Sequence, residues 1–286
     1  MMPNYNIKEI ILWIKSELKG YYPLSEANSL STLVLCNKLN YSKTQLLVNF
    51  DRVLSTKIIN EIDQIVNELK LYKPIQYILG YTTFYNIDFK VSEGVLIPRP
   101  ETEELVDWII KENKQGFYTI LDIGTGSGII AISLSKNMIG SVVTAIDIAD
   151  EPLKITQQNC TLNKVNVELF KYDILNPSKK INNTFDIIVS NPPYVTESEK
   201  TIMHQNVLEN EPHLALFVSD NDPLVFYRHI IDFALDHLNS GGKIYFEINE
   251  LFGTEVAMLL EEKGFNEIEV RKDINNKDRM IRAVLK

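Results

Sequence analysis

The sequence predicts an α/β protein in which a parallel sheet, covered by helices on both faces, follows a small bundle of helices. Beyond residue 117, short apolar segments typical of buried strands alternate with longer segments of helical periodicity. This alternation indicates a parallel sheet, because parallel neighbours need crossover connections long enough to hold a helix. We expect strands at 117–123, 141–147, 166–173, 185–190 and 243–248, and helices around 128–138, 151–163, 223–238 and 251–263. The segments 266–273 and 278–286 predict a terminal hairpin that leaves one edge strand antiparallel.

The first seventy residues predict a bundle of consecutive helices. Ile7, Ile10 and Ile14 recur at helical spacing. Further along, Ser42 and Gln45 form an S-x-x-Q capping box, which marks the start of another helix. Residues 1–72 are therefore expected to form a helical domain. We expect this domain to dock a substrate, with a purely stabilising module as the alternative.

A β-hairpin is expected to link this bundle to the rest of the chain. Apolar and polar residues alternate over 81–91, and Asn86 stands where a turn is needed. We therefore assign 73–98 to a hairpin linker and 99–286 to the domain that contains the parallel sheet.

The composition is that of a soluble globular protein. Of the 286 residues, 45% are apolar and 23% are charged, close to average values, which argues against disorder. No apolar run approaches the roughly 20 residues needed to span a bilayer, so no membrane association is expected. Cys36 and Cys160 are the only cysteines, and no C-x-x-C motif or Cys/His cluster predicts a metal site. We expect a reduced, cytoplasmic protein without a structural metal.

The net charge of −9 is distributed unevenly along the chain. Residues 1–90 carry 10 Lys/Arg against 8 Asp/Glu, a net of +2, whereas the remainder carries 19 against 30, a net of −11. Phosphate contacts supply most of the affinity in nucleic-acid binding. An acidic second half therefore predicts no direct binding of nucleic acid.

The turn GTGSG at 124–128 follows the first expected strand and predicts a nucleoside-binding site. Alternating glycines let the backbone approach a ligand closely, and the following helix points its N-terminus at that ligand. The dinucleotide fingerprint requires glycine where the sequence has Ile129, so a NAD(P) enzyme is disfavoured. Asp147 ends the second strand, where a carboxylate can bind both ribose hydroxyls or cap the helix beginning near Pro152. Asp122, just before the glycines, can hold an ammonium group or act as a buried cap.

The tetrad Asn191-Pro192-Pro193-Tyr194 follows the fourth expected strand and predicts methylation of a planar amide or amino nitrogen. Such a nitrogen is a poor nucleophile, because its lone pair is delocalised. Attack on a sulfonium methyl removes that delocalisation and acidifies the N–H hydrogens. The side-chain carbonyl of Asn191 and the backbone carbonyl of Pro192 can accept those hydrogens and favour the transition state. Tyr194 can stack on the flat target group.

Six motifs together resemble the HemK/PrmC group of protein-(glutamine-N5) methyltransferases. They are KPIQY at 73–77, IPRPETE at 97–103, LDIGTGSG at 121–128, Asp147, NPPY at 191–194 and EPHLAL at 211–216. The likeness covers nearly the whole chain, and IPRPETE together with NPPY is far more specific than either motif alone. The resemblance implies the class I S-adenosylmethionine-dependent methyltransferase fold, which is a Rossmann-like, mostly parallel sheet of seven strands.

The resemblance also implies a reaction and its participants. The methyl group of S-adenosyl-L-methionine would pass to the N5 amide nitrogen of the glutamine in the Gly-Gly-Gln motif of class I peptide chain release factors. S-adenosyl-L-homocysteine would be the product, and no metal would take part. By resemblance, the cofactor is contacted by Gly124, Thr125, Gly126, Ser127, Gly128, Asp147 and Asn191. The glutamine amide is held by Asn191, Pro192, Pro193 and Tyr194.

One position departs from the pattern of some family members. In those members an aromatic residue packs on the adenine, just after an acidic residue that ends the third strand. Here Asp173 is followed by Ile174, which would make an aliphatic contact with the adenine.

Two other functions compete with this interpretation. A nucleic-acid amino methyltransferase acting on adenine N6 or cytosine N4 would also use NPPY, because those targets are amino groups on flat carbons. Such an enzyme must extrude its base and bind phosphates, which the acidic second half disfavours. A non-catalytic scaffold on the same fold usually lacks the glycine turn or the tetrad, and this sequence contains both.

Overall fold

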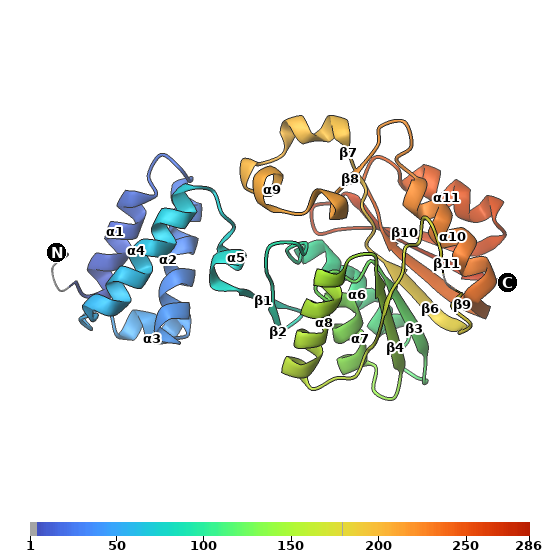
Figure 1. The fold of residues 1–286 in the computed structure, drawn as a ribbon, viewed down its shortest axis with the longest axis horizontal. Helices are drawn as coiled ribbons and strands as arrows, with labels where there is room; N and C mark the ends of the chain where they lie inside the picture. Colours follow the sequence, from blue (N-terminus) through green and yellow to red (C-terminus); the bar gives the residue numbers. More distant parts are fainter. Residues whose placement is uncertain (1–4, 179) are drawn as a thin grey trace. The chain divides into compact units, whose positions relative to one another are not determined.

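The computed structural model describes residues 5–178 and 180–286, which fall into two compact units (Figure 1). The helical unit consists of the chain up to Gly80 together with His204–Asn210. The sheet unit consists of Tyr81–Met203 and Glu211–Lys286. The chain therefore passes between the two units at three points.

Amphipathic helices build the helical unit around one apolar core. The first five are α1 Ile7–Glu17, α2 Leu24–Leu39, α3 Lys43–Val48, α4 Thr56–Lys70 and α5 Ile75–Leu79. Ile7, Ile10 and Ile14 of α1 are fully buried, as their spacing predicts. The predicted capping box is present, since Ser42 Oγ accepts from the Gln45 N–H at 3.2 Å and Gln45 Oε1 accepts from the Ser42 N–H at 2.8 Å.

The helical unit extends past residue 72, where the sequence predicts its boundary. Ile75 of α5 packs into the same core, and the helix ends at Gly80, whose φ of 75° suits a glycine cap. The short helix α9, Gln205–Asn210, also belongs to this unit. There the Asn210 side-chain amide donates a hydrogen bond to the Tyr72 carbonyl at 3.3 Å.

Seven strands form the sheet of the sheet unit, in the order β10-β11-β9-β6-β3-β4-β5 (Figure 1). Their bounds are β3 Thr119–Ile123, β4 Val142–Asp147, β5 Glu168–Lys171, β6 Phe185–Ser190, β9 Leu238–Glu247, β10 Phe265–Lys272 and β11 Asp278–Leu285. The strands from β9 to β5 are parallel, as the alternation of strand and helix predicts.

The antiparallel strand is not at the edge, and this part of the prediction is wrong. β11 pairs antiparallel with both β9 and β10, so it lies inside the sheet, and the edge strand β10 runs with the parallel strands. The distribution of apolar residues explains this order. Met280, Ile281 and Ala283 of β11 are at most 3% exposed, whereas β10 carries Arg271 and Lys272 on the surface.

The opposite edge strand, β5, is not buried as the sequence predicts. Glu168, Phe170 and Lys171 are exposed, because β5 pairs only with β4 and has no strand on its other side. Charged side chains on such a strand protect its free edge from further pairing.

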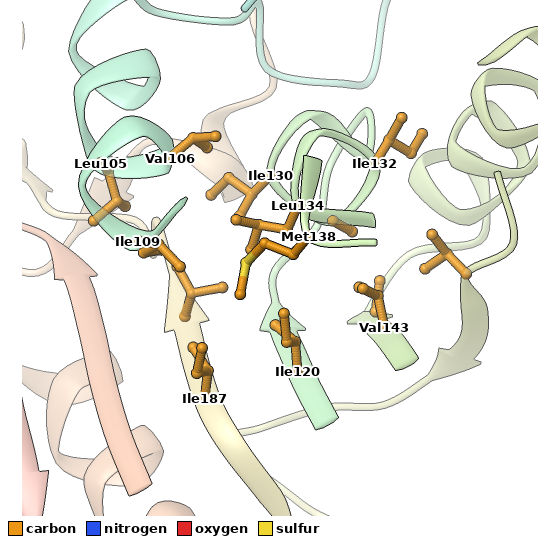
Figure 2. Packing of buried hydrophobic residues seen from close by; sticks show 14 of the residues in the cluster. Leu105, Val106, Ile109, Ile120, Ile130, Ile132, Leu134, Met138, Val143 and Ile187 are labelled. Atoms are coloured by element: carbon orange, nitrogen blue, oxygen red, sulfur yellow. The ribbon is translucent and has the colours of Figure 1, made fainter. Parts of the chain in front are cut away.

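Helices cover both faces of the sheet and enclose two apolar cores. They are α6 Pro100–Glu112, α7 Ile129–Asn137, α8 Asp150–Asn163, α10 Val225–His237 and α11 Gly253–Glu262. In one core, side chains of α6 and α7 such as Leu105 and Leu134 pack on Ile120 and Ile187 of the sheet (Figure 2). The second core lies between the sheet and helices α10 and α11.

The predicted hairpin is present as β1, Tyr81–Phe84, and β2, Ile87–Lys90. It is an integral part of the sheet unit, because its apolar side chains join the first core. The Lys90 N–H also donates to Asn159 Oδ1 of α8 at 2.7 Å.

Short elements connect the longer ones. They are β7 Val195–Thr196, β8 Phe217–Val218, and the 3₁₀ helices η1 Glu197–Ile202 and η2 His213–Ala215. Over residues 5–178 and 180–286, no helix is both long enough and apolar enough to cross a membrane.

Candidate active site

A pocket opens at the carboxyl ends of β3, β4 and β6, where parallel α/β sheets bind their ligands. The ends of these strands and the loops that follow them supply much of its lining, including Gly124, Asp147 and Asn191. Ile174, in the loop after β5, and Pro192, which follows Asn191, line it as well. The fold thus brings together residues that are far apart in the sequence and that the sequence analysis singled out.

The glycine turn presents only alternate residues to this pocket. Gly124 and Gly126 line it and have φ values of 76° and 57°, and a Cβ at either position would meet nothing within 4 Å. Gly128 is different, because a Cβ there would lie 2.7 Å from Thr156 Cγ2. The first two glycines therefore keep backbone accessible to a ligand, and Gly128 is required by packing.

Thr125 and Ser127, between the glycines, are 4% and 2% exposed and stabilise the turn from inside. The Thr125 hydroxyl donates to Asp122 Oδ2 at 2.7 Å, and the Ser127 carbonyl accepts from Asn159 Nδ2 at 2.9 Å. Asp122 Oδ2 also accepts from the Ala131 N–H at 3.2 Å, so this carboxylate caps the start of α7.

Only one of the two carboxylate oxygens of Asp122 takes part in the capping contacts. Its Oδ1 is buried and has no hydrogen-bond partner within the described part of the chain. Burial raises the pKa of this carboxyl to about 7. A positively charged or N–H donor group at this place would satisfy the oxygen.

Asp147 both shapes the site and lines it. Its Oδ2 accepts from the Gly126 N–H at 3.0 Å, and its Oδ1 accepts from the Ala149 N–H at 3.1 Å. The carboxylate therefore holds the glycine turn and the turn into α8 together. Burial raises its pKa above the usual range. Each carboxylate oxygen retains a second lone pair, which a ribose hydroxyl can use.

Ile174 lines the pocket beside Asp173, as part of the loop after β5. The Asp173 carboxylate accepts from the Leu175 N–H at 2.9 Å and from the Asn176 N–H at 3.2 Å, so it shapes this loop. The Ile174 side chain is partly buried against the second core.

The NPPY tetrad follows β6 and splits into two parts. Asn191, Pro192 and Pro193 line the pocket. Tyr194 is not among the described residues that line it. Its hydroxyl instead donates to Glu247 Oε1 at 2.9 Å, and burial raises its pKa well above the usual range, so the phenol stays protonated.

Two buried glutamates belong to this site although sequence reasoning did not single them out. Glu247 ends β9 and accepts hydrogen bonds from Tyr194 and Thr102. Glu211 accepts from the Ile97 N–H at 3.2 Å and pairs with Arg99 at 2.7 Å. The sequence does contain signals for these residues. Thr102 lies in the motif IPRPETE and Glu211 in EPHLAL, and Glu247 is a charged residue at the end of the apolar segment KIYFE.

No group of three or more His, Cys, Asp or Glu side chains that could hold a metal ion occurs in the described ranges. Asn191 and Pro192, whose carbonyls can accept hydrogen bonds, line the same pocket as Gly124 and Gly126, an arrangement suited to transfer of a small group from a nucleoside cofactor to a nitrogen.

The fold and the site define a methyltransferase of the Rossmann-like class. Residues 102–217 match the family model described as the methyltransferase small domain, and residues 9–80 match that of the PrmC N-terminal domain. A 16S rRNA methyltransferase from T. thermophilus, solved in complex with AdoMet and guanosine, superposes with a TM-score of 0.53 at 17% identity. That match covers 72% of this chain and 50% of the other, and it supports the predicted fold.

Curated relatives identify the family. A release factor glutamine methyltransferase from Flavobacterium psychrophilum is 46% identical over 93% of this chain and 94% of its own length. The protein of the same name from Bacteroides thetaiotaomicron is 44% identical over 97% of this chain and 99% of its own length. The chain belongs to the family of release factor glutamine methyltransferases. The predicted family and the predicted class I methyltransferase fold are thus confirmed.

Proposed function

We propose that the protein transfers the methyl group of S-adenosyl-L-methionine to the N5 amide nitrogen of the glutamine in the Gly-Gly-Gln motif of class I release factors. One observation carries the proposal. Asn191 and Pro192 line the same pocket as the open glycines Gly124 and Gly126, so amide acceptors and a nucleoside site adjoin. The names of the curated relatives support the same substrate.

The residues of the pocket fit the cofactor. The open faces of Gly124 and Gly126 leave room for a ligand close to the backbone. Asp122 is fully buried just behind Ile123 and Gly124, which line the pocket, and its unpartnered Oδ1 would suit an ammonium group that reached it. When bound, S-adenosyl-L-methionine supplies a sulfonium methyl group that a nitrogen can attack. In this proposal Asp147 binds the ribose hydroxyls and Ile174 contacts the adenine. Thr125, Ser127 and Gly128 hold the shape of the turn.

On the substrate side, Asn191 and Pro192 bind and orient the glutamine amide. Their carbonyls accept the two N–H hydrogens, which grow more acidic as the nitrogen lone pair leaves the amide π system. Acceptors that strengthen in this way stabilise the transition state more than the ground state. Pro193 keeps the backbone rigid without adding an N–H that would repel the target. Tyr194 flanks these acceptors, with its hydroxyl fixed on Glu247.

No general base is required among these residues. After methyl transfer the nitrogen is cationic and acidic enough to release a proton to water. The proposed mechanism therefore depends on positioning and on electrostatic complementarity.

The helical unit is proposed to dock the body of the release factor. A single glutamine side chain offers too little contact area to distinguish one protein from another. Around α3, Leu47, Val48 and Val53 are 60%, 75% and 57% exposed, so this segment offers apolar side chains to a partner. Arg52 is exposed in the same segment and adds a positive charge. Because translation termination takes place in the cytoplasm, the proposed reaction assigns the enzyme to that compartment.

Incubation with labelled S-adenosyl-L-methionine tests the function. The purified protein is offered an intact class I release factor, a short Gly-Gly-Gln peptide, duplex DNA and RNA in parallel. We expect label on the release factor, and mass mapping should locate it on the glutamine of the Gly-Gly-Gln motif. Label found only on adenine or cytosine would overturn the proposal.

A further inference from the structure

We propose that Thr102 and Glu247 are positioning residues that fix which way the Asn191 side-chain amide points. The carbonyl of Asn191 then faces the pocket, and its NH₂ group faces the protein interior. This inference rests on the proposed function and adds to it the device that orients the acceptor.

A chain of hydrogen bonds connects the three side chains. The Asn191 Nδ2 donates to Thr102 Oγ1 at 3.3 Å, and Thr102 Oγ1 donates to Glu247 Oε2 at 2.6 Å. Thr102 lies in the first turn of α6, and Glu247 ends β9. Ser190 pairs in register with Phe246, so the residues that follow them, Asn191 and Glu247, leave neighbouring strands at the same level.

The number of hydroxyl protons decides the direction of this chain. A threonine hydroxyl has one proton to donate, and a carboxylate can only accept. Since the short contact to Glu247 uses that proton, Thr102 can offer Asn191 only a lone pair. Asn191 must therefore present its NH₂ group to Thr102, which turns its carbonyl away from Thr102.

The Glu247 carboxylate is held by two hydroxyls. Tyr194 donates to its Oε1 and Thr102 to its Oε2, so one buried carboxylate connects both ends of the NPPY tetrad. Glu247 and Thr102 are each 1% exposed, so water cannot replace either contact without a rearrangement. A buried acceptor that loses its donor is costly, which makes this arrangement rigid.

The orientation matters for the reaction because the two ends of an asparagine amide are nearly the same size. A flipped Asn191 would present two N–H donors to a substrate amide that also offers N–H donors. The acceptor required at the pocket would then be absent, although the residue and the fold were intact. Thr102 and Glu247 prevent this flip without touching substrate.

Thr102→Val tests the proposal, because valine keeps the shape of threonine and removes the hydroxyl. We expect kcat on release factor to fall about tenfold, less than the roughly hundredfold loss for removing such a group entirely. The affinity for S-adenosyl-L-homocysteine should stay within about twofold, whereas general damage to the fold would lower both. Thr102→Ser should recover most of kcat. Thr144→Val is a matched control, since Thr144 is also buried, at 3% exposed, but lies in β4 outside the pocket lining.

Glu247→Leu provides a second, independent variant. It leaves the Thr102 hydroxyl in place but frees its proton to donate to the Asn191 carbonyl. Because Glu247→Leu also removes the acceptor of the Tyr194 hydroxyl, Thr102→Val, Glu247→Leu and the double variant are compared in a Tyr194→Phe background. In that background we expect Glu247→Leu to lower kcat about as much as Thr102→Val, and the double variant should be no worse than either single one. Additive losses would overturn the proposal, because two residues acting through one orientation share a single effect.

A measurement without turnover separates this proposal from the proposed function. With ¹⁵N-labelled asparagine and Asn191→Asp for assignment, one side-chain proton of Asn191 should exchange slowly in the wild type and in Thr102→Ser, and rapidly in Thr102→Val. Unchanged exchange in Thr102→Val would overturn the positioning role even if release factor is methylated. If no release factor is methylated, the function fails while the exchange result still decides the orientation.

Discussion

The Glu211 carboxylate lies 2.7 Å from the Arg99 guanidinium and joins two segments, 94–99 and 211–215, that contribute residues to the candidate cofactor pocket. The Glu211 side chain is 1% exposed, whereas that of Arg99 is 31% exposed. Glu211 also accepts from the Ile97 N–H at 3.2 Å, so one carboxylate fixes a side chain and the backbone of the same loop. Neither segment contains a long helix or strand, so the contacts of Glu211 hold this part of the pocket wall in position.

Glu211→Gln should therefore weaken cofactor binding. Glutamine can still accept from the Ile97 N–H, but the charge that attracts Arg99 is lost. We expect about a tenfold rise in the dissociation constant of S-adenosyl-L-homocysteine, or roughly 1.4 kcal/mol, measured by calorimetry. Glu168→Gln, an exposed change on β5, serves as the control. Equal affinities for the two variants would show that this ion pair does not shape the cofactor site.

Asn191→Ala should lose most of its turnover while the fold survives. Removing a preorganised acceptor of transition-state hydrogens costs about 3 kcal/mol, on the order of a hundredfold in kcat. Asn191→Asp should also be slow, because it places a charge where a neutral acceptor is needed. Single-turnover rates at saturating cofactor measure the effect. Near-normal rates in both variants would remove Asn191 from the mechanism.

Asp147→Ala should weaken cofactor binding more than it slows chemistry at saturation. Each charge-assisted hydrogen bond to ribose contributes roughly 1.5–3 kcal/mol. The variant also frees the Gly126 N–H from its 3.0 Å contact. Asp147→Asn, which keeps one acceptor oxygen, should therefore show an intermediate loss of affinity. If calorimetry finds wild-type affinity for S-adenosyl-L-homocysteine in both variants, Asp147 serves only as a cap.

Asp122 should make the stability of the ligand-free protein depend on pH. Burial raises its pKa in the folded state from 3.8 to about 7. Its stabilising contribution is therefore complete below about pH 4 and is lost as the pH rises through 7. The free energy of unfolding should fall by on the order of 2 kcal/mol between pH 5 and pH 8, and Asp122→Asn should reduce this difference. Urea unfolding at both pH values measures it, and identical pH dependence in the two proteins would contradict the assignment.

Removing the helical unit should abolish recognition of the whole substrate and spare cofactor binding. The deletion must cover residues 1–80, and His204–Asn210 must be replaced by a short Gly/Ser linker, because that segment belongs to the same unit. Methylation of intact release factor should fall steeply, while methylation of a short Gly-Gly-Gln peptide, slow from the start, should change little. A folded deletion variant that modifies intact release factor at the full rate would show that the unit only stabilises the chain.

The sequence predicts those parts of the molecule that depend on local patterns. The alternation of strands and helices, the turn at Gly124 and the capping box at Ser42 each follow from neighbouring residues. The order of β10 and β11 depends instead on which of two strands offers more apolar surface to β9, a comparison that periodicity alone does not make.

In the candidate site, too, local sequence patterns predict some residues, whereas contacts between distant residues determine others. Asp147 and Asn191 stand at strand ends, which the sequence marks. The contact between Thr102 and Glu247 joins residues 145 positions apart, and no spacing rule connects them. The sequence identifies Tyr194 as a member of the tetrad, but the direction of its hydroxyl depends on that same distant glutamate.

The short helix α9 limits how this protein can be rebuilt by recombination. A domain attached through one linker can be exchanged between relatives at a single junction. Here the polypeptide passes between the units at 80–81, 203–204 and 210–211, so an exchanged helical unit must bring a matching α9 from the same donor. A chimera that takes only the first eighty residues from a relative would pack the relative's helices against the α9 of this protein. Changes in the two segments should therefore be inherited together, although more than 120 residues separate them.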